Sequence, residues 1–187
     1  MASRPERIPR LKDRLRPGLE IVSIGINPSI YSARAGFPFA RPQNRFWKAL
    51  NASRLVGEEL APSRASVDRL FARHRIGFTD VVKRASGNAA ELDPSDFKKW
   101  APRLLLKLRR SAPRVACFHG LTAYRPFLAL ALGATDRAPA LGPQPEVVGT
   151  TKLFVVPNPS PANAHFTLAD QAAWYDRLAD FLLSLKD

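Results

Sequence analysis

LEIVSIGINPS, residues 19–29, is the stretch that decides the fold. Residues 19–24 form a near-continuous apolar run, which is typical of a strand covered on both faces. The run passes directly into residues 25–29, GINPS, and a second apolar run at 153–157 passes directly into NPS at 158–160. One Asn-Pro would indicate only a turn, but two copies in matching contexts favour a site. Loops leaving parallel strands at their carboxyl ends converge on one crevice, so we expect the two loops to face each other across it.

The rest of the chain alternates between helical and strand patterns. Helices are predicted at residues 44–55, 66–74, 94–108, 122–132 and 168–185, and strands at 77–82, 115–118 and 153–156. This alternation predicts an α/β fold of three layers, α/β/α, with a central, mainly parallel sheet. Residues 138–145 contain three prolines and are expected to form a surface loop.

Composition predicts one globular domain with a polyanionic partner. The chain has 187 residues, 45% of them hydrophobic, and its 29 Lys and Arg against 16 Asp and Glu give a formal charge of +13. A membrane surface is the rival partner, but no segment approaches the roughly 20 apolar residues of a spanning helix. Residues 1–18 are rich in Arg and Pro and predict a basic arm, either lying on phosphates or solvated, ahead of a domain at 19–187. They do not resemble a secretory signal, so we expect a cytoplasmic, or in a bacterium nucleoid-associated, protein.

Cysteine and histidine usage predicts no metal and no other cofactor. Cys117 is the single cysteine and lies in an apolar run, where a buried core thiol is expected. One thiol cannot form an internal disulfide or ligate an iron–sulfur cluster. The three histidines, His74, His119 and His165, are far apart and lack metal-ligand spacing.

The residues of the first loop favour one kind of chemistry over others. The chain has neither a glycine-rich phosphate loop ending in Lys-Ser or Lys-Thr nor a serine nucleophile elbow. Asn27 can orient a water molecule but cannot remove its proton at neutral pH. Such a residue suits a dissociative reaction, for example cleavage of the N-glycosidic bond of uracil through an oxocarbenium-like sugar. Phe37 and Phe39, on a loop shaped by Gly and Pro, could stack on a flat base, whereas Phe46 and Trp47 are expected in the core.

Three segments together resemble the mismatch-specific uracil/thymine-DNA glycosylase family: GINP at 25–28, GFPFA at 36–40 and NRFWK at 44–48. NPSP at 158–161 is similar to that family's other signature and to the His-Pro-Ser-Pro loop of the wider uracil-DNA glycosylase superfamily. The resemblance extends loosely over residues 19–185. It implies a three-layer α/β/α fold and a monofunctional, metal-independent enzyme that flips its target base out of the duplex. We expect a monomer acting on uracil in double-stranded DNA, above all in G·U mismatches.

The resemblance also implies roles for single residues. Asn27 would position the attacking water, Phe39 would stack on the flipped uracil, and backbone groups near Ile26 and Phe39 would read its edge. Asn158 would lie beside the base where relatives have a histidine, and Ser160 would contact phosphate. Further contacts with DNA are expected from Arg45, Pro161, Ala162 and Asn163.

Two positions depart from the family pattern. Relatives often insert a bulky residue into the duplex gap where this chain offers only Ala162, so the plug is expected to be weak. Relatives tend to have an uncharged helix cap where this chain has Asp93. That carboxylate could take a proton from the water and stabilise the sugar cation, or it could simply cap the helix that follows. Asp80, the other acid near the crevice, is expected to point into a layer and pair with an arginine.

Two other functions remain open at the level of sequence. A non-catalytic nucleic-acid-binding protein on a degenerate glycosylase fold would have the same charge, but Asn27 and Phe39 favour an enzyme. A hydrolase of small nucleosides would use the same pocket, but it leaves the charge of +13 unexplained.

Overall fold

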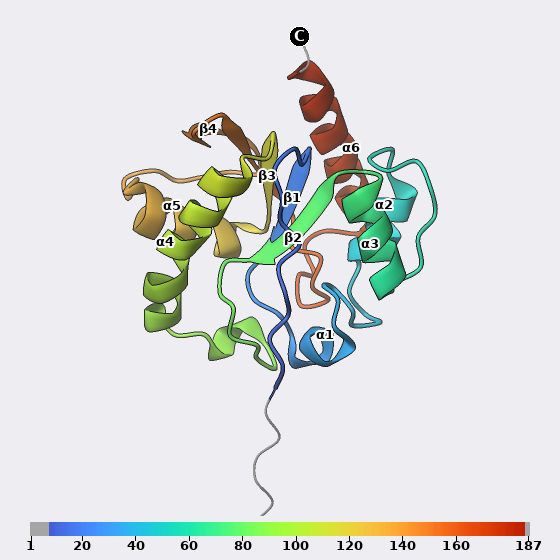
Figure 1. Cartoon of the computed structure of the whole chain (residues 1–187), viewed down its shortest axis with the longest axis horizontal. Helices are drawn as coiled ribbons and strands as arrows, with labels where there is room; N and C mark the ends of the chain where they lie inside the picture. The colour runs from blue at the N-terminus through green and yellow to red at the C-terminus, as the bar shows by residue number, and fades with distance from the viewer. Residues whose placement is uncertain (1–7, 186–187) are drawn as a thin grey trace, which may run out of the picture.

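A computed structural model describes residues 8–185 and shows a five-stranded sheet between two layers of helices (Figure 1). The strands are β1 (Ile21–Gly25), β2 (Ile76–Asp80), β3 (Val115–His119), β4 (Gly142–Val148) and β5 (Thr151–Val156), in the order β2-β1-β3-β5-β4. All neighbours are parallel except β4, which pairs antiparallel with β5 at one edge. The predicted three-layer α/β/α fold with a mainly parallel sheet is confirmed.

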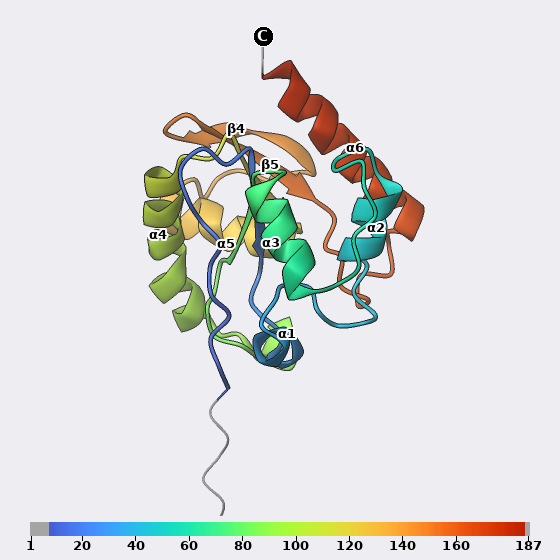
Figure 2. The ribbon, with the colours of Figure 1, turned by 45° about the vertical axis from the view of Figure 1, so that its right-hand side comes forward.

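The apolar run around β1 divides its side chains between two cores. Val22 and Ile24 pack on the side covered by α4 (Pro94–Ser111) and α5 (Leu121–Leu132). Ile21 belongs to the core on the opposite face of the sheet, which three other helices cover (Figure 2). These are α2 (Phe46–Ala52), α3 (Arg64–Ala72) and α6 (Leu168–Ser184). All five residues of β1 are buried, as expected of a central strand in a parallel sheet.

Two short helices lie in the loops after β1 and β2 and were not predicted. α1 (Ile30–Ala35) begins where the Ser29 Oγ accepts a hydrogen bond from the Ser32 N–H at 3.0 Å. The short 3₁₀ helix η1 (Ala89–Glu91) is capped by Asn88. Neither is long enough to show a helical repeat in the sequence.

The prediction of a surface loop at residues 138–145 is wrong in its second half. Strand β4 begins at Gly142 and includes Pro143 and Pro145. Its pairing with β5 is interrupted between Pro143 and Val147. Proline is tolerated there because an edge strand leaves part of its N–H row unpaired.

The basic segment expected as an arm at residues 1–18 is in part built into the body. Residues 1–7 lie outside the described residues. Leu11 is buried, and Arg14 exchanges two backbone hydrogen bonds with Phe78 of β2, at 2.8 and 3.0 Å. Arg16 donates to the Phe71 carbonyl oxygen at 3.0 Å. The domain therefore includes the chain from Leu11 onward, which corrects the expected boundary at residue 19. Within residues 8–185, none of the helices combines the length and apolar character needed to span a bilayer.

Candidate active site

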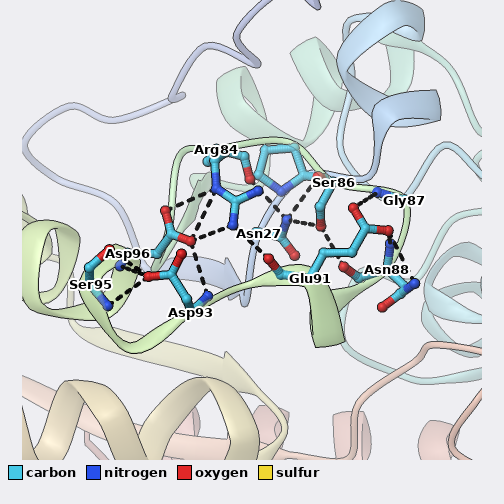
Figure 3. A network of polar contacts seen from close by, with 10 residues as sticks. Asn27, Arg84, Ser86, Gly87, Asn88, Glu91, Asp93, Ser95 and Asp96 are labelled. Carbon is cyan, nitrogen blue, oxygen red and sulfur yellow. Dashed lines mark hydrogen bonds and ion pairs between the residues drawn. The ribbon is translucent and has the colours of Figure 1, made fainter.

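Asn27 is held by its amide nitrogen and presents its amide oxygen (Figure 3). Nδ2 donates to the Arg84 carbonyl oxygen at 2.9 Å and to the Ser86 Oγ at 2.8 Å. The backbone is tied to the same segment, because the Ser86 N–H donates to the Pro28 carbonyl oxygen at 3.2 Å. Oδ1 accepts no hydrogen bond from any residue that the structure describes. The side chain therefore has a fixed orientation and a free acceptor, which is the arrangement needed to align a water molecule.

The segment that holds Asn27 is itself fixed by an ion pair. The Arg84 guanidinium donates to Asp96 in α4 from Nε at 3.0 Å and from Nη2 at 2.5 Å. Nη2 also donates to the Glu91 carbonyl oxygen at 2.7 Å. The hydrogen bond from Arg84 lowers the pKa of Asp96, which is largely buried, below its ordinary value. Figure 3 shows this network running from Asp96 through Arg84 to Asn27.

The sequence analysis did not identify Arg84 and Ser86 as residues of the site. They follow the predicted strand 77–82, at whose carboxyl end a parallel sheet builds its site. The reasoning that singled out the two Asn-Pro-Ser loops would have included them.

Phe39 lies on a constrained loop and against another aromatic ring. Its φ of 54° is uncommon for a bulky residue and is typical of strained functional segments. The next residue fixes it, because the Ala40 N–H donates to the Ser32 Oγ at 3.1 Å. The Phe39 ring stacks on Phe46 with centroids 4.2 Å apart and planes 14° apart. Phe46 and Trp47 are buried, as expected of core aromatics.

The second loop is a turn closed by its own side chains. The Asn158 Oδ1 accepts from the Ser160 N–H at 2.9 Å, and the Asn163 Nδ2 donates to the Asn158 carbonyl oxygen at 2.9 Å. The Asn158 Nδ2 donates to no residue within 8–185. Pro161 and Ala162 are exposed at the tip, whereas Ser160 is half-buried. The loop therefore presents one free amide donor near its base and small side chains at its tip.

Arg45 clamps this loop to the start of α2. Its guanidinium donates to the carbonyl oxygens of Phe166 at 2.5 Å, Ser160 at 2.8 Å and Asn163 at 2.6 Å. Its backbone N–H donates to the Pro159 carbonyl oxygen at 3.0 Å. In the structure Arg45 thus holds the second loop in place, a role that the sequence did not suggest. The contact with DNA expected for Arg45 stays a prediction.

The end of β3 lies between the two loops, because β1 and β5 are its two neighbours in the sheet. The His119 Nε2 is 2.7 Å from the Ser23 Oγ, and its ring lies edge to face with Phe39 at 5.0 Å. Burial lowers the pKa of His119 to about 3, so the imidazole is neutral at physiological pH. Gly120 follows, and a Cβ added there would lie 2.9 Å from the Asn158 Cβ. Both loops therefore follow the carboxyl ends of strands on the same side of the sheet, as predicted, and the aromatic rings of Phe39 and His119 lie between them.

Asp93 caps α4. Its carboxylate accepts from the backbone N–H of Ser95 at 2.8 Å and of Asp96 at 3.3 Å, and also from the Ser95 hydroxyl. These hydrogen bonds, the Ser95 hydroxyl first, lower the pKa of Asp93 below its ordinary value. The side chain is exposed, and within residues 8–185 its hydrogen bonds lead to Asn27 through Asp96 and Arg84. Of the two roles left open by the sequence, this geometry favours the cap.

Substituting Asp93 separates the two roles. If the protein has the base-excision activity that the resemblance implies, we expect Asp93→Ser and Asp93→Asn to keep its rate within about threefold of the wild-type rate, because both side chains still cap a helix. The measurement is single-turnover excision together with thermal unfolding. A loss of tenfold or more in both variants at unchanged melting temperature would assign Asp93 a chemical role.

Comparisons with known proteins identify the family and the fold of this chain. The family model described as the Uracil DNA glycosylase superfamily matches residues 13–182. A solution NMR structure of a protein from Methanosarcina acetivorans, described as a proposed uracil DNA glycosylase, is similar with a TM-score of 0.53 and 23% sequence identity. That similarity covers 92% of this chain and 98% of the other, and it shows a shared fold. Because the family match spans both loops and most of the chain, the protein belongs to the uracil DNA glycosylase superfamily.

Proposed function

We propose that this chain hydrolyses the N-glycosidic bond of uracil in double-stranded DNA, above all in G·U mismatches, and leaves an abasic site. The observation that carries the proposal is the Asn27 side chain, whose nitrogen is engaged by Arg84 and Ser86 and whose oxygen is free. Membership of the superfamily supports a DNA glycosylase. The formal charge of +13 fits a DNA phosphate backbone better than a free nucleoside.

The proposed reaction is dissociative. The flipped uracil stacks on Phe39, and the bond between C1′ and N1 breaks with its electron pair leaving on the base. Asn27 Oδ1 accepts a hydrogen bond from a water molecule, whose oxygen then bonds to C1′ while its proton passes to solvent. The free Nδ2 of Asn158 donates to a carbonyl oxygen of the departing base, where negative charge develops. Backbone groups near Ile26 and Phe39 contact the base edge, and Ser160 contacts the flanking phosphate.

Duplexes with one uracil test this function. Excision followed by alkaline cleavage is compared on U·G, U·A and single-stranded substrates. We expect U·G to be cut fastest, because extruding a mispaired base costs less than extruding a paired one. Binding to every substrate without cutting any would favour the non-catalytic alternative. Release of uracil from free deoxyuridine at a comparable rate would favour a nucleoside hydrolase.

The small residue at the tip of the second loop supplies a prediction about flipping. Ala162 is exposed and too small to fill the space of an extruded nucleotide, so the flipped state is held weakly. We expect Ala162→Leu to tighten binding to abasic product and to narrow the difference in rate between U·G and U·A. Equal or weaker binding, measured by product dissociation, would assign the wedge to another residue, for example Asn163 or His165.

A further inference from the structure

A basic cluster surrounds Trp100 on helix α4, next to the candidate active site. The indole is half-buried and packs against the core on this side of the sheet. Three cations lie over its ring, the Arg103 Cζ at 4.9 Å from the ring centroid, the Lys99 Nζ at 5.4 Å and the Arg10 Cζ at 5.8 Å. At these distances the face of an aromatic ring attracts a cation. These four residues form what we call the Trp100 cluster.

The three cations of the Trp100 cluster have no acidic partner of their own. All three residues are exposed, and none forms an ion pair with any of residues 8–185. The one acid of α4, Asp96, is paired with Arg84. Lys99 and Arg103 are four residues apart, a spacing at which two like charges repel each other on a helix. An anion that binds between them relieves this repulsion, so the cluster favours an anionic ligand.

Most of the remaining positive charge on α4 is explained within the protein. Lys107 forms an ion pair with Asp13 at 2.7 Å. Arg109 and Arg110 lie in the last turn, where the helix dipole favours a cation. The two α4 cations of the Trp100 cluster lie earlier in the helix, so neither explanation applies to them.

The Trp100 cluster lies beside the segment that holds Asn27. Asp96 pairs with Arg84, whose carbonyl oxygen accepts the hydrogen bond from Asn27. Trp100 follows Asp96 by one helical turn, about 6 Å along the helix axis. Arg10 belongs to the first described residues, which lie at the end of the molecule that carries α1, the helix after the Asn27 loop (Figure 1 and Figure 2). The cluster is thus placed to contact a ligand that extends beyond the pocket.

We propose that Arg10, Lys99 and Arg103 bind the phosphate backbone of the duplex on one side of the flipped nucleotide. For its partner, duplex DNA, the inference rests on the proposed function. Three exposed cations from two separate segments suit a row of phosphates, and the formal charge of +13 indicates a polyanion. Such contacts position the protein on DNA and carry no information about sequence. The DNA footprint then extends from the pocket over the first half of α4.

The test removes the three charges together, in a cluster variant with Arg10→Met, Lys99→Met and Arg103→Met. Methionine keeps a flexible apolar chain against the indole. Equilibrium binding to a duplex with one abasic site opposite guanine is measured from about 50 to 200 mM salt. We expect the slope of log binding constant against log salt concentration to fall in magnitude by about 2 to 3, since each phosphate contact contributes roughly 0.9. Arg103→Met alone, with an expected fall of about 0.9, gives the same readout if the cluster variant does not fold.

The matched control combines Arg73→Met, Arg109→Met and Arg110→Met. It removes the same number of charges from exposed residues at the ends of α3 and α4. These helix ends precede the amino ends of β2 and β3, at the opposite end of the parallel strands from the site. We expect the control to keep the wild-type slope. An equal fall in both triple variants would overturn the proposal, because it would show a general effect of net charge.

Shortened duplexes locate the contact on the DNA. The duplex is shortened toward the abasic site from one end and, separately, from the other end. We expect the difference in slope between the wild type and the cluster variant to disappear on one of these duplexes and to persist on the other. A difference that behaves alike on both shortened duplexes overturns the proposal.

Two further outcomes separate this proposal from the proposed function. An unchanged slope in the cluster variant on the full-length duplex overturns this proposal alone, and it is the result expected if the cluster binds an acidic protein. A wild-type protein that shows the expected slopes but releases no uracil from a U·G duplex overturns the proposed function and leaves the contact with DNA standing.

Discussion

Replacing Asn27 by alanine is expected to slow single-turnover uracil excision by about 100-fold or more, the scale of one lost transition-state contact. The substitution removes the free Oδ1, which aligns the water molecule in the proposed reaction. It leaves Arg84 in place, because that side chain is held by Asp96 and Glu91. DNA binding should change little, since Asn27 has no charge. Rapid-quench excision on U·G duplexes and equilibrium binding to the same duplex measure the two effects.

Asn51→Ala is the matched control. Asn51 in α2 also bridges backbone groups with its amide, donating to the Leu60 carbonyl oxygen at 3.1 Å and accepting from the Leu60 N–H at 3.0 Å. Its loss should lower the melting temperature without slowing the chemical step. Wild-type excision by Asn27→Ala would show that the proposed site is wrong.

Arg45→Met is expected to slow excision by about 10- to 100-fold, because each charged hydrogen bond contributes about 1.5–3 kcal/mol and tenfold in rate is about 1.4 kcal/mol. The variant loses three donations to carbonyl oxygens in residues 160–166, so the second loop no longer holds the free amide of Asn158 in the place that the proposed reaction requires. Excision rate and the salt dependence of DNA binding are the measurements. If Arg45 acts by holding the second loop and does not contact phosphate, the slope of log binding constant against log salt concentration stays unchanged.

Lys48→Met provides the comparison on the same helix. Lys48 is exposed, so its substitution removes one positive charge without touching the loop clamp. We expect wild-type excision from it. A slope reduced by about 0.9 in Arg45→Met, with a normal chemical rate, would instead make Arg45 a phosphate contact and remove its positioning role.

The sequence predicted the three layers and the side of the sheet, at the carboxyl ends of the parallel strands, where the site lies. Both follow from hydrophobic patterns that extend over many residues. The apolar runs before Asn27 and Asn158 indicated central strands, and parallel strands place the loops at one edge. Helix α4 could be recognised from Asp93-Pro94-Ser95-Asp96, where the predicted cap is present.

Contacts between distant segments could not be predicted in the same way. Arg45 is separated by 115 residues from Ser160, and Asn27 by 57 from Arg84, so no local pattern links either pair. Strand β4 was missed because two prolines in seven residues suggest a loop unless the strand is known to lie at an edge. Asp80 was expected to pair with arginine, but in the structure its carboxylate forms an ion pair with Lys83, three residues further along the chain.

Mass-spectrometric detection of the released base tests most directly whether the protein hydrolyses uracil from DNA. Purified protein is mixed in excess with a duplex that contains one uracil opposite guanine, and free uracil and intact abasic strand are followed over time. We expect both to appear together in equal amounts, and we expect Asn27→Ala to slow the appearance of both by about 100-fold or more. Stable binding of the duplex with no free uracil would contradict it, as would release from the Asn27 variant at the wild-type rate.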